Sequence, residues 1–256
     1  MRKCGQEFGW LISLMAGLIG GSAAVPAVAA ASLDGVDVSH YQGNINWAAV
    51  KNAGTVFAIA KATEGTTFLD AYLNANIAGM KRYGIIPGAY HFGHPSIDAT
   101  AQADFFINTV HRANGGNFYG LLQLVLDLEV TDGRTPAQVW AWTQTFVARV
   151  HATTGRPCII YTGFYFWRDS VGNPNNNLNC PLWLAAYVSN PTPYIPQAWS
   201  SVGWAFWQYT DTGSVPGISG HADGDYFKNA GSYPNIHALV IPKPRPQVGG
   251  HGPIFP

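Results

Sequence analysis

Apolar runs alternate with amphipathic segments over the first two thirds of the chain. Residues 55–61 and 121–128 are short β-rich runs, whereas the segment 70–83 repeats its apolar residues at helical spacing and is followed by Gly84. A glycine at that position is typical of a helix C-terminus. The pattern predicts strands at 36–38, 55–61, 85–92, 121–128 and 158–161, with helices at 47–52, 70–83, 99–112 and 136–153 between them.

Alternation of strands and helices predicts parallel βαβ units, and nearly continuous apolar strands fit a sheet covered on both faces. After residue 161 the helical pattern fades, and two further strands, 182–187 and 204–209, lie among loops rich in Asn, Pro and Gly. We therefore predict an α/β barrel with an irregular last third. An open doubly wound sheet is the alternative, but no Gly-x-Gly-x-x-Gly fingerprint follows the first strand.

The N-terminal segment has the features of a secretory signal peptide. Arg2 and Lys3 precede a mostly apolar stretch that ends in small residues near Ala31. An uncleaved membrane anchor is the alternative, because the apolar run approaches the length of a membrane span. We expect a secreted protein that has no membrane association after cleavage. The chain then divides into a signal peptide at 1–31, one folded domain at 32–240 and a flexible Pro/Gly-rich tail at 241–256.

The overall composition excludes several classes of protein. Hydrophobic residues make up 47% of the chain and charged residues 11%, which is too apolar for a disordered protein. The formal net charge is zero, so no broad basic field is available to bind nucleic acid. Aromatic residues reach 13%, which is compatible with stacking against sugar-like ligands, although aromatic residues also fill cores.

Two cysteines, Cys158 and Cys180, remain after removal of the signal peptide. In an exported chain two cysteines are a possible disulfide. Two buried free thiols are the alternative, because spacing in the sequence does not show whether the Cα atoms approach closely enough.

Carboxylates are scarce, which makes their positions informative. Glu129 is one of only two glutamates after residue 31, and it lies two residues after Asp127 at the end of an apolar run. Alternation along a strand places both on one face and Leu126 and Leu128 on the other. The C-terminal strand ends of an α/β barrel carry its active site. Repulsion between the two carboxyls would raise one pKa and give the protonated acid and ionised partner that glycosidic cleavage needs. Helix capping or pairing with basic side chains is the alternative.

Further acids and histidines allow other kinds of site. Asp37 ends the first predicted strand, and Asp223 and Asp225 lie in an acidic loop that lacks the ligand spacing of an EF-hand. His91 and His94, with Asp127, would suggest a zinc-dependent sugar deacetylase. Such a site needs three convergent ligands, and no His-Glu-x-x-His motif is present. We expect no metal and no cofactor.

Eight short motifs follow one another between residues 33 and 227. They occupy residues 37–43, 60–65, 88–92, 126–129, 160–162, 182–187, 207–210 and 217–223. Read in this order, from DVSHYQG through LDLE to GISGHAD, they resemble the glycoside hydrolase family 25 lysozymes, the Chalaropsis-type muramidases. The resemblance implies a modified TIM-like barrel with about five βα units, followed by a β-rich, helix-poor last third.

The same resemblance implies an activity and a set of roles. The reaction is hydrolysis of the β-1,4 bond between N-acetylmuramic acid and N-acetylglucosamine in bacterial cell-wall peptidoglycan. Glu129 is then the general acid, Asp127 the partner that orients the substrate acetamido group, and Asp37 and Asp223 the flanking carboxylates. Apart from the resemblance, the position of Lys61 at a strand end indicates that it pairs with a cleft carboxylate or holds substrate, and a plain ion pair is the alternative. The residues expected along the sugar groove are Tyr90, Tyr161, Trp183, Tyr187 and Trp207.

Two points stay open at this stage. In the closing motif the family usually has Val-Asp-Leu-Asn, whereas residues 222–225 are Ala-Asp-Gly-Asp, so Asp225 competes with Asp223 for its role. Acids one pleat apart leave little room for water, which favours retention with the substrate acetamido oxygen as nucleophile. A non-catalytic cell-wall glycan-binding protein is the alternative function, and a chitinase-like hydrolase is a more distant one. We expect a monomer.

Overall fold

The computed structural model describes residues 33–244. The predicted signal peptide and residues 245–256 of the predicted tail lie outside the described residues. Within residues 33–244, no helix combines the length and the apolar character needed to cross a membrane.

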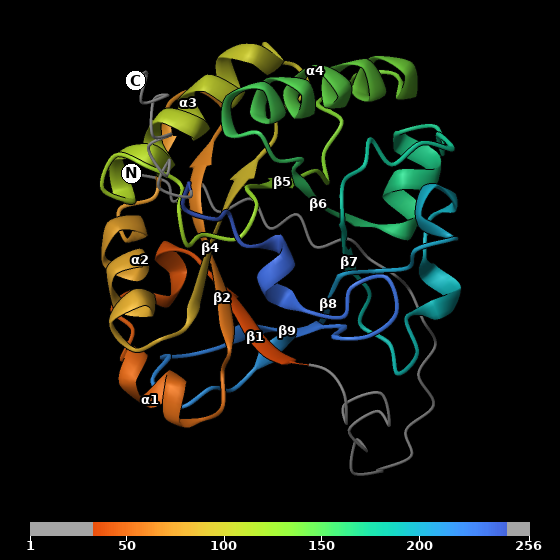
Figure 1. Cartoon of the computed structure of the whole chain (residues 1–256). Helices are drawn as coiled ribbons and strands as arrows, with labels where there is room; N and C mark the ends of the chain where they lie inside the picture. Colours follow the sequence, from red (N-terminus) through yellow and green to blue (C-terminus); the bar gives the residue numbers. More distant parts are fainter. Residues whose placement is uncertain (1–32, 245–256) are drawn as a thin grey trace, which may run out of the picture.

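A closed barrel organises the described part of the chain (Figure 1). Hydrogen bonds join the strands in the order β1-β9-β8-β7-β6-β5-β4-β2, and β1 also pairs with β2, which closes the barrel. All neighbouring pairs are parallel except those of β9, which runs antiparallel to both β1 and β8. The barrel strands are β1 (Leu33–Val38), β2 (Phe57–Glu64), β4 (Ile86–Phe92), β5 (Val125–Asp127), β6 (Ile159–Gly163), β7 (Leu182–Ala185), β8 (Phe206–Gly213) and β9 (Ala222–Phe227).

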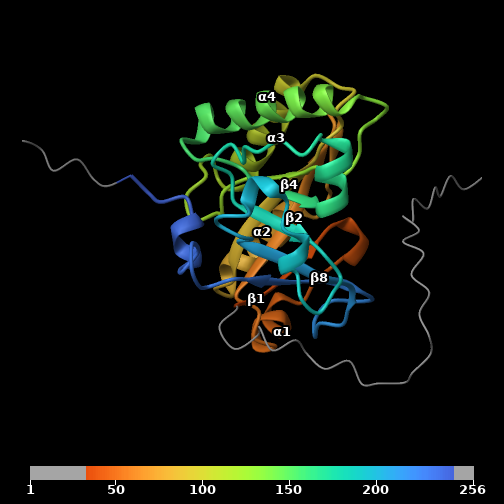
Figure 2. The same cartoon turned by 90° about the vertical axis from the view of Figure 1, so that its right-hand side faces the viewer.

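The α-helices follow the early strands and cover one side of the barrel (Figures 1 and 2). Three of them begin at side-chain caps, since Asn46, Asp98 and Thr135 accept hydrogen bonds from the first turns of α1, α3 and α4. Gly155 ends α4 in the left-handed conformation. The four helices are α1 (Trp47–Asn52), α2 (Leu73–Arg82), α3 (Ala99–Ala113) and α4 (Pro136–Thr154).

The prediction of about five βα units and a helix-poor last third is confirmed. The fifth unit is β6 followed by the π-helix η3 (Phe166–Ser170), and no α-helix of the described residues begins after α4. Short 3-10 turns and loops cover the side formed by β7, β8 and β9 (Figure 1). The remaining elements are β3 (Phe68–Leu69), which pairs with β2, and the 3-10 turns η2 (His40–Gln42), η4 (Thr192–Tyr194), η5 (Gln197–Trp199) and η6 (Ile236–Leu239).

The structure corrects two details of the predicted elements. The segment expected as an acidic loop is β9, because hydrogen bonds to β1 and β8 on both sides outweigh the low strand propensity of its Asp and Gly residues. The strand predicted at 121–128 is shorter: β5 begins at Val125, and the preceding Leu122 and Gln123 bond to Val240 and Leu239 near the end of the domain. Ile241 is also buried and hydrogen-bonded to Leu121, so the folded domain continues one residue into the predicted tail.

Strand alternation divides the core into two layers. Phe57 and Ile59 of β2 point into the barrel, whereas Ala58 and Ala60 point outward against the helices. The interior cluster fills the half of the barrel where the parallel strands begin, and Ile236 of η6 packs against it. The interior is therefore free to form a site only towards the C-terminal ends of these strands.

The structure does not contain the possible disulfide. Cys158 lies immediately before β6 and Cys180 two residues before β7, and both are buried free cysteines. Burial raises the pKa of the Cys158 thiol well above its ordinary value and that of Cys180 to about 12. Both side chains belong to the core layer outside the barrel, as expected of small apolar residues.

Candidate active site

A cavity opens at the C-terminal ends of the parallel strands, with about 350 Å³ of empty space that is partly open to solvent. The four carboxylates predicted as catalytic all line it, although they come from strands spread along the whole domain. Carboxyl and aromatic side chains dominate the wall. The lining residues are Asp37, Tyr90, Asp127, Glu129, Tyr161, Trp183, Gln208 and Asp223.

Asp127 and Glu129 enter the cavity side by side from the end of β5. Their separation by one residue turns both inward, while Leu126 and Leu128 are buried in the layer under the helices. Burial raises the pKa of Asp127 well above its ordinary value, and the nearby charge of Glu129 raises it further. Burial also raises the pKa of Glu129, against the opposing charge of Lys61. Both acids therefore favour the neutral form, whereas the sequence predicted a raised pKa for one of them.

Asp37 and Asp223 face each other across the antiparallel pair of β1 and β9. Burial raises the pKa of Asp223 to about 6. The pKa of Asp37 lies well above its ordinary value, chiefly because of burial and then because of the charges of Asp225 and Asp223. No ion pair among the described residues involves either carboxylate. This side of the cavity is therefore an acidic cluster in which protons are shared.

Gln208 is a cavity residue that the sequence analysis missed. Its Nε2 donates a 2.7 Å hydrogen bond to Oδ2 of Asp37. Its Oε1 accepts hydrogen bonds from the hydroxyls of Tyr161, at 2.9 Å, and Tyr187, at 2.8 Å. The sequence does contain a signal for this residue, because Gln208 is the single amide in the aromatic run 206–209. Strand alternation places it on the face that points into the barrel.

Three of the five aromatic residues predicted for the sugar groove line the cavity. Tyr90, Tyr161 and Trp183 form part of its wall, and the rings of Tyr161 and Trp183 lie 4.8 Å apart at an edge-on angle of 69°. Tyr187 lies outside the lining and is 54% exposed, while its hydroxyl reaches Gln208. These side chains offer both flat faces and hydroxyl groups to a ligand.

Trp207 does not belong to the cavity, and the prediction for it is corrected. Its side chain is fully buried in the layer outside the barrel, and its indole Nε1 donates to the carbonyl oxygen of Ala186 at 2.6 Å. Phe206 and Gln208 point into the barrel on either side of it. Strand alternation therefore turns Trp207 away from any bound sugar.

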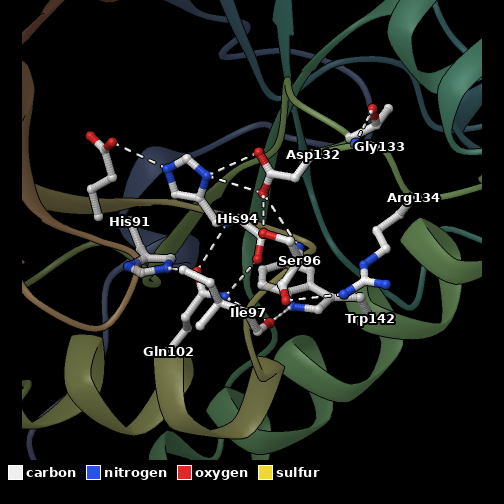
Figure 3. A network of polar contacts seen from close by, with 11 residues as sticks. His91, His94, Ser96, Ile97, Gln102, Asp132, Gly133, Arg134 and Trp142 are labelled. Atoms are coloured by element: carbon white, nitrogen blue, oxygen red, sulfur yellow. Dashed lines mark hydrogen bonds and ion pairs between the residues drawn. The ribbon is translucent and has the colours of Figure 1, made fainter.

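Lys61 is held just outside the lining by a chain of polar side-chain contacts. Its Nζ lies 2.6 Å from Oε2 of Glu64, and the other oxygen of Glu64 contacts His94 Nε2 at 3.1 Å. His94 Nδ1 in turn lies 3.1 Å from Oδ2 of Asp132, which also accepts from Ser96 (Figure 3). The chain joins the end of β2 to the loop between β5 and α4. Lys61 is thus fixed close enough to the cavity for its charge to lower the pKa values of Asp127 and Glu129.

The histidines do not form the zinc site considered above. His91 is buried, and Oγ1 of Thr63 lies 2.8 Å from its Nδ1. Its Nε2 lies 3.1 Å from Oε1 of Gln102 (Figure 3). The two ring nitrogens of His94 face Glu64 and Asp132 instead of Asp127. Within residues 33–244, no group of three or more His, Cys, Asp or Glu side chains is arranged to hold a metal ion.

Asp225 does not compete with Asp223 for a place in the cavity. It is 0% exposed and does not belong to the lining, and its Oδ1 accepts a 2.8 Å hydrogen bond from Trp183 Nε1. Of the two acids on β9, Asp223 alone faces the cavity.

Comparisons with known proteins agree with this geometry. The family model described as glycosyl hydrolases family 25 matches residues 36–218. Lysozyme M1 of Streptomyces globisporus is 40% identical over 81% of this chain and 71% of its own length. An N,O-diacetylmuramidase of Arthroderma benhamiae is 37% identical over 77% of this chain and 87% of its own.

A solved structure shows the same fold. The bacterial lysozyme from Streptomyces coelicolor superimposes with a TM-score of 0.73 and is 37% identical, over 82% of this chain and 98% of that one. The chain therefore belongs to glycosyl hydrolase family 25.

Proposed function

We propose that this protein is a lysozyme that hydrolyses the β-1,4 bond between N-acetylmuramic acid and N-acetylglucosamine in peptidoglycan. The observation that carries the proposal is the pair of buried Asp127 and half-buried Glu129, side by side at a strand end in a cavity with two further acids. Family membership and the lysozyme and muramidase names of the relatives support the same substrate.

Glu129 acts as the general acid in this proposal. Its raised pKa lets it hold, at higher pH than an ordinary glutamate, the proton that goes to the glycosidic oxygen of the departing N-acetylglucosamine. Oδ1 of Asp127 is buried and has no hydrogen-bond partner among the described residues. A substrate acetamido N–H that donates to this carboxyl favours its ionised form, so the proton of the pair resides on Glu129 when substrate is bound.

The acetamido oxygen, oriented by Asp127, then attacks the anomeric carbon of N-acetylmuramic acid as the glycosidic bond breaks. Glu129, now ionised, accepts a proton from water as that water opens the cyclic intermediate, and the anomeric configuration is retained. Asp37 and Asp223 place negative charge near the developing oxocarbenium centre. Tyr90, Tyr161 and Trp183 supply the aromatic wall against which the sugar rings rest.

The protein is secreted in this proposal, with residues 1–31 removed as a signal peptide, and it acts on the cell wall as a monomer. An N-terminal sequence of the protein recovered from culture medium checks the cleavage site. Retention of the full N-terminus would contradict this part of the proposal.

Digestion of purified peptidoglycan by the wild-type protein and by Glu129→Gln tests the activity. We expect products with reducing muramic acid ends from the wild type, identified by mass spectrometry after reduction, and their loss in Glu129→Gln. Asp104→Asn, on the outer face of α3, is a matched control for loss of one carboxylate. Reducing glucosamine ends would place the cleavage at the other bond, and binding without cleavage would favour a glycan-binding protein. Nuclear magnetic resonance of the first anomer formed tests retention.

A further inference from the structure

A second hollow, the α1–α2 groove, lies between these two neighbouring helices on the outside of the barrel (Figure 1). It has about 620 Å³ of empty space that is partly open to solvent, and it shares no lining residue with the cavity. Ala75, Ala78 and Gly79 give α2 a face of small residues, against which Trp47 of α1 packs. A Cβ at residue 79 would lie 2.7 Å from Nε1 of Trp47, so the position of the indole requires a glycine there.

The indole N–H of Trp47 has no acceptor among the described residues. Nε1 donates to a backbone carbonyl oxygen in Trp142, Trp199 and Trp207. Trp47 forms no such bond, although its side chain is only 5% exposed, and its Nε1 is not sealed from solvent. Because Trp47 lines the α1–α2 groove, this N–H is accessible from the groove. A largely buried indole usually pairs its N–H, so the donor is free for a ligand.

The α1–α2 groove is positively charged at one end. Arg82, in the last turn of α2, lines it and forms no ion pair with any described residue. Its guanidinium lies 5.6 Å from the ring centre of Tyr83, which also belongs to the lining. Lys51 of α1 donates to the carbonyl oxygen of Gly84, next to Tyr83, and adds a second positive charge. Neither helix contains an Asp or Glu, so an anion in the groove meets no opposing charge from them.

We propose that the α1–α2 groove binds a short peptide that ends in a free carboxylate, which is the chemistry of the stem peptides of peptidoglycan. Arg82 holds the carboxylate, because its planar guanidinium offers two parallel N–H donors. The indole N–H of Trp47 donates to an oxygen of the peptide. Apolar lining residues, Ile45, Ala75 and Ala78, contact small side chains such as those of alanine. This apolar wall favours a peptide over a bare phosphate group.

The choice of stem peptides as the ligand rests on the proposed lysozyme function, whereas the affinity for a peptide carboxylate does not. The α1–α2 groove is then a second contact with the cell wall, made outside the cavity. It binds substrate without touching the bond that is cleaved.

Titration with the dipeptide acetyl-Ala-Ala tests the groove without any catalysis. Binding is followed through the indole N–H signals in proton–nitrogen NMR spectra, and Trp47→Phe assigns the Trp47 signal. We expect the free acid to shift this signal saturably. The C-terminal amide of the same dipeptide is expected to bind at least about 10-fold more weakly, the factor for one hydrogen bond to a charged group.

Arg82→Gln is expected to weaken binding of the free acid by at least about 10-fold, for the same reason. Arg112→Gln is the matched control, because Arg112 is an exposed residue in the last turn of α3 and its loss changes the net charge equally. On intact peptidoglycan, Arg82→Gln is expected to raise KM by at least about threefold and to leave kcat unchanged. On glycan chains stripped of their peptides, the KM of this variant is expected to equal that of the wild type.

An unmoved Trp47 signal, or equal binding of the free acid and the amide, would overturn the proposal. Inorganic phosphate that binds as tightly as the free acid would assign the groove to phosphate groups and overturn the peptide assignment. An unchanged KM on intact peptidoglycan in Arg82→Gln would overturn the role in wall binding. If the wild type does not cleave peptidoglycan, the proposed function fails, and the titration still decides whether the groove binds a peptide carboxylate.

Discussion

Gln208 and Asp37 are 171 residues apart in the sequence, and a 2.7 Å hydrogen bond joins Nε2 of Gln208 to Oδ2 of Asp37 inside the cavity. The hydroxyls of Tyr161 and Tyr187 fix the orientation of this amide by donating to its oxygen. Gln208 thus links the last parallel strand to the first one. Its amide supports the ionised form of a carboxylate that burial and neighbouring acids destabilise.

Replacement of this amide is expected to reduce activity. Gln208→Met keeps the length of the side chain, removes the donor to Asp37 and lowers kcat/KM on peptidoglycan by about 10- to 100-fold. The pKa of Asp37 rises, so the acid limb of the kcat/KM profile moves to higher pH. Gln197→Met, at an exposed position on η5, is the matched control and is expected to behave as the wild type. An unchanged pH profile in Gln208→Met would show that the amide does not tune Asp37.

Loss of the Lys61 charge is expected to move the whole pH–activity profile upward. The ammonium lowers the pKa values of Asp127 and Glu129, so Lys61→Met lets both rise. The proposed reaction needs Asp127 ionised and Glu129 protonated. If both pKa values rise, the acid and alkaline limbs of the kcat/KM profile therefore both shift to higher pH. Lys61→Arg keeps the positive charge and serves as the control. A fall in activity with unmoved limbs would instead indicate that Lys61 contacts substrate.

Removal of a cavity acid is expected to stabilise the fold at neutral pH. The pKa of Asp127 is higher in the folded protein than in the unfolded chain. The protonated carboxyl therefore contributes its full stability below about pH 4, and this contribution is lost as pH rises towards the pKa of the folded state. Asp127→Asn abolishes that loss, so its Tm exceeds that of the wild type at pH 7 and converges with it near pH 4. Differential scanning calorimetry at both pH values measures this, with the exposed Asp169→Asn as the control. A lower Tm at pH 7 would contradict the prediction. Gain of stability with loss of activity is common at active sites.

Gly79→Ala in α2 tests the packing of the helix layer. Alanine favours helices by about 1 kcal/mol over glycine, but a Cβ at residue 79 would overlap the ring of Trp47 in α1. Overpacking of this kind costs about 1–3 kcal/mol, so we expect a net loss of stability in urea unfolding. Ala78→Gly, at the exposed neighbouring position, measures the propensity effect alone. A more stable Gly79→Ala would mean that Trp47 moves aside at little cost.

Prediction from the sequence succeeded where local pattern carries the information. Period-two alternation placed Asp127 and Glu129 on one face at a strand end, and the structure has both in the cavity. The same rule, applied to Trp207, would have turned this residue outward and Gln208 inward. The prediction for Trp207 came from the family resemblance, and it was wrong because strand alternation turns this side chain into the layer outside the barrel.

The sequence by itself determined the order of strands and helices, the scarcity of acids and the membership of Asp37, Asp127, Glu129 and Asp223 in one set, because periodicity, composition and ordered motifs are local properties. Only the tertiary structure decided that residues 222–227 form β9, that Gln208 bonds to Asp37 and that Asp225 is sealed beneath the cavity. These relationships depend on closure of the barrel. Closure brings together residues that are far apart in the chain and withdraws their carboxyl groups from water, and burial of this kind dominates their pKa values.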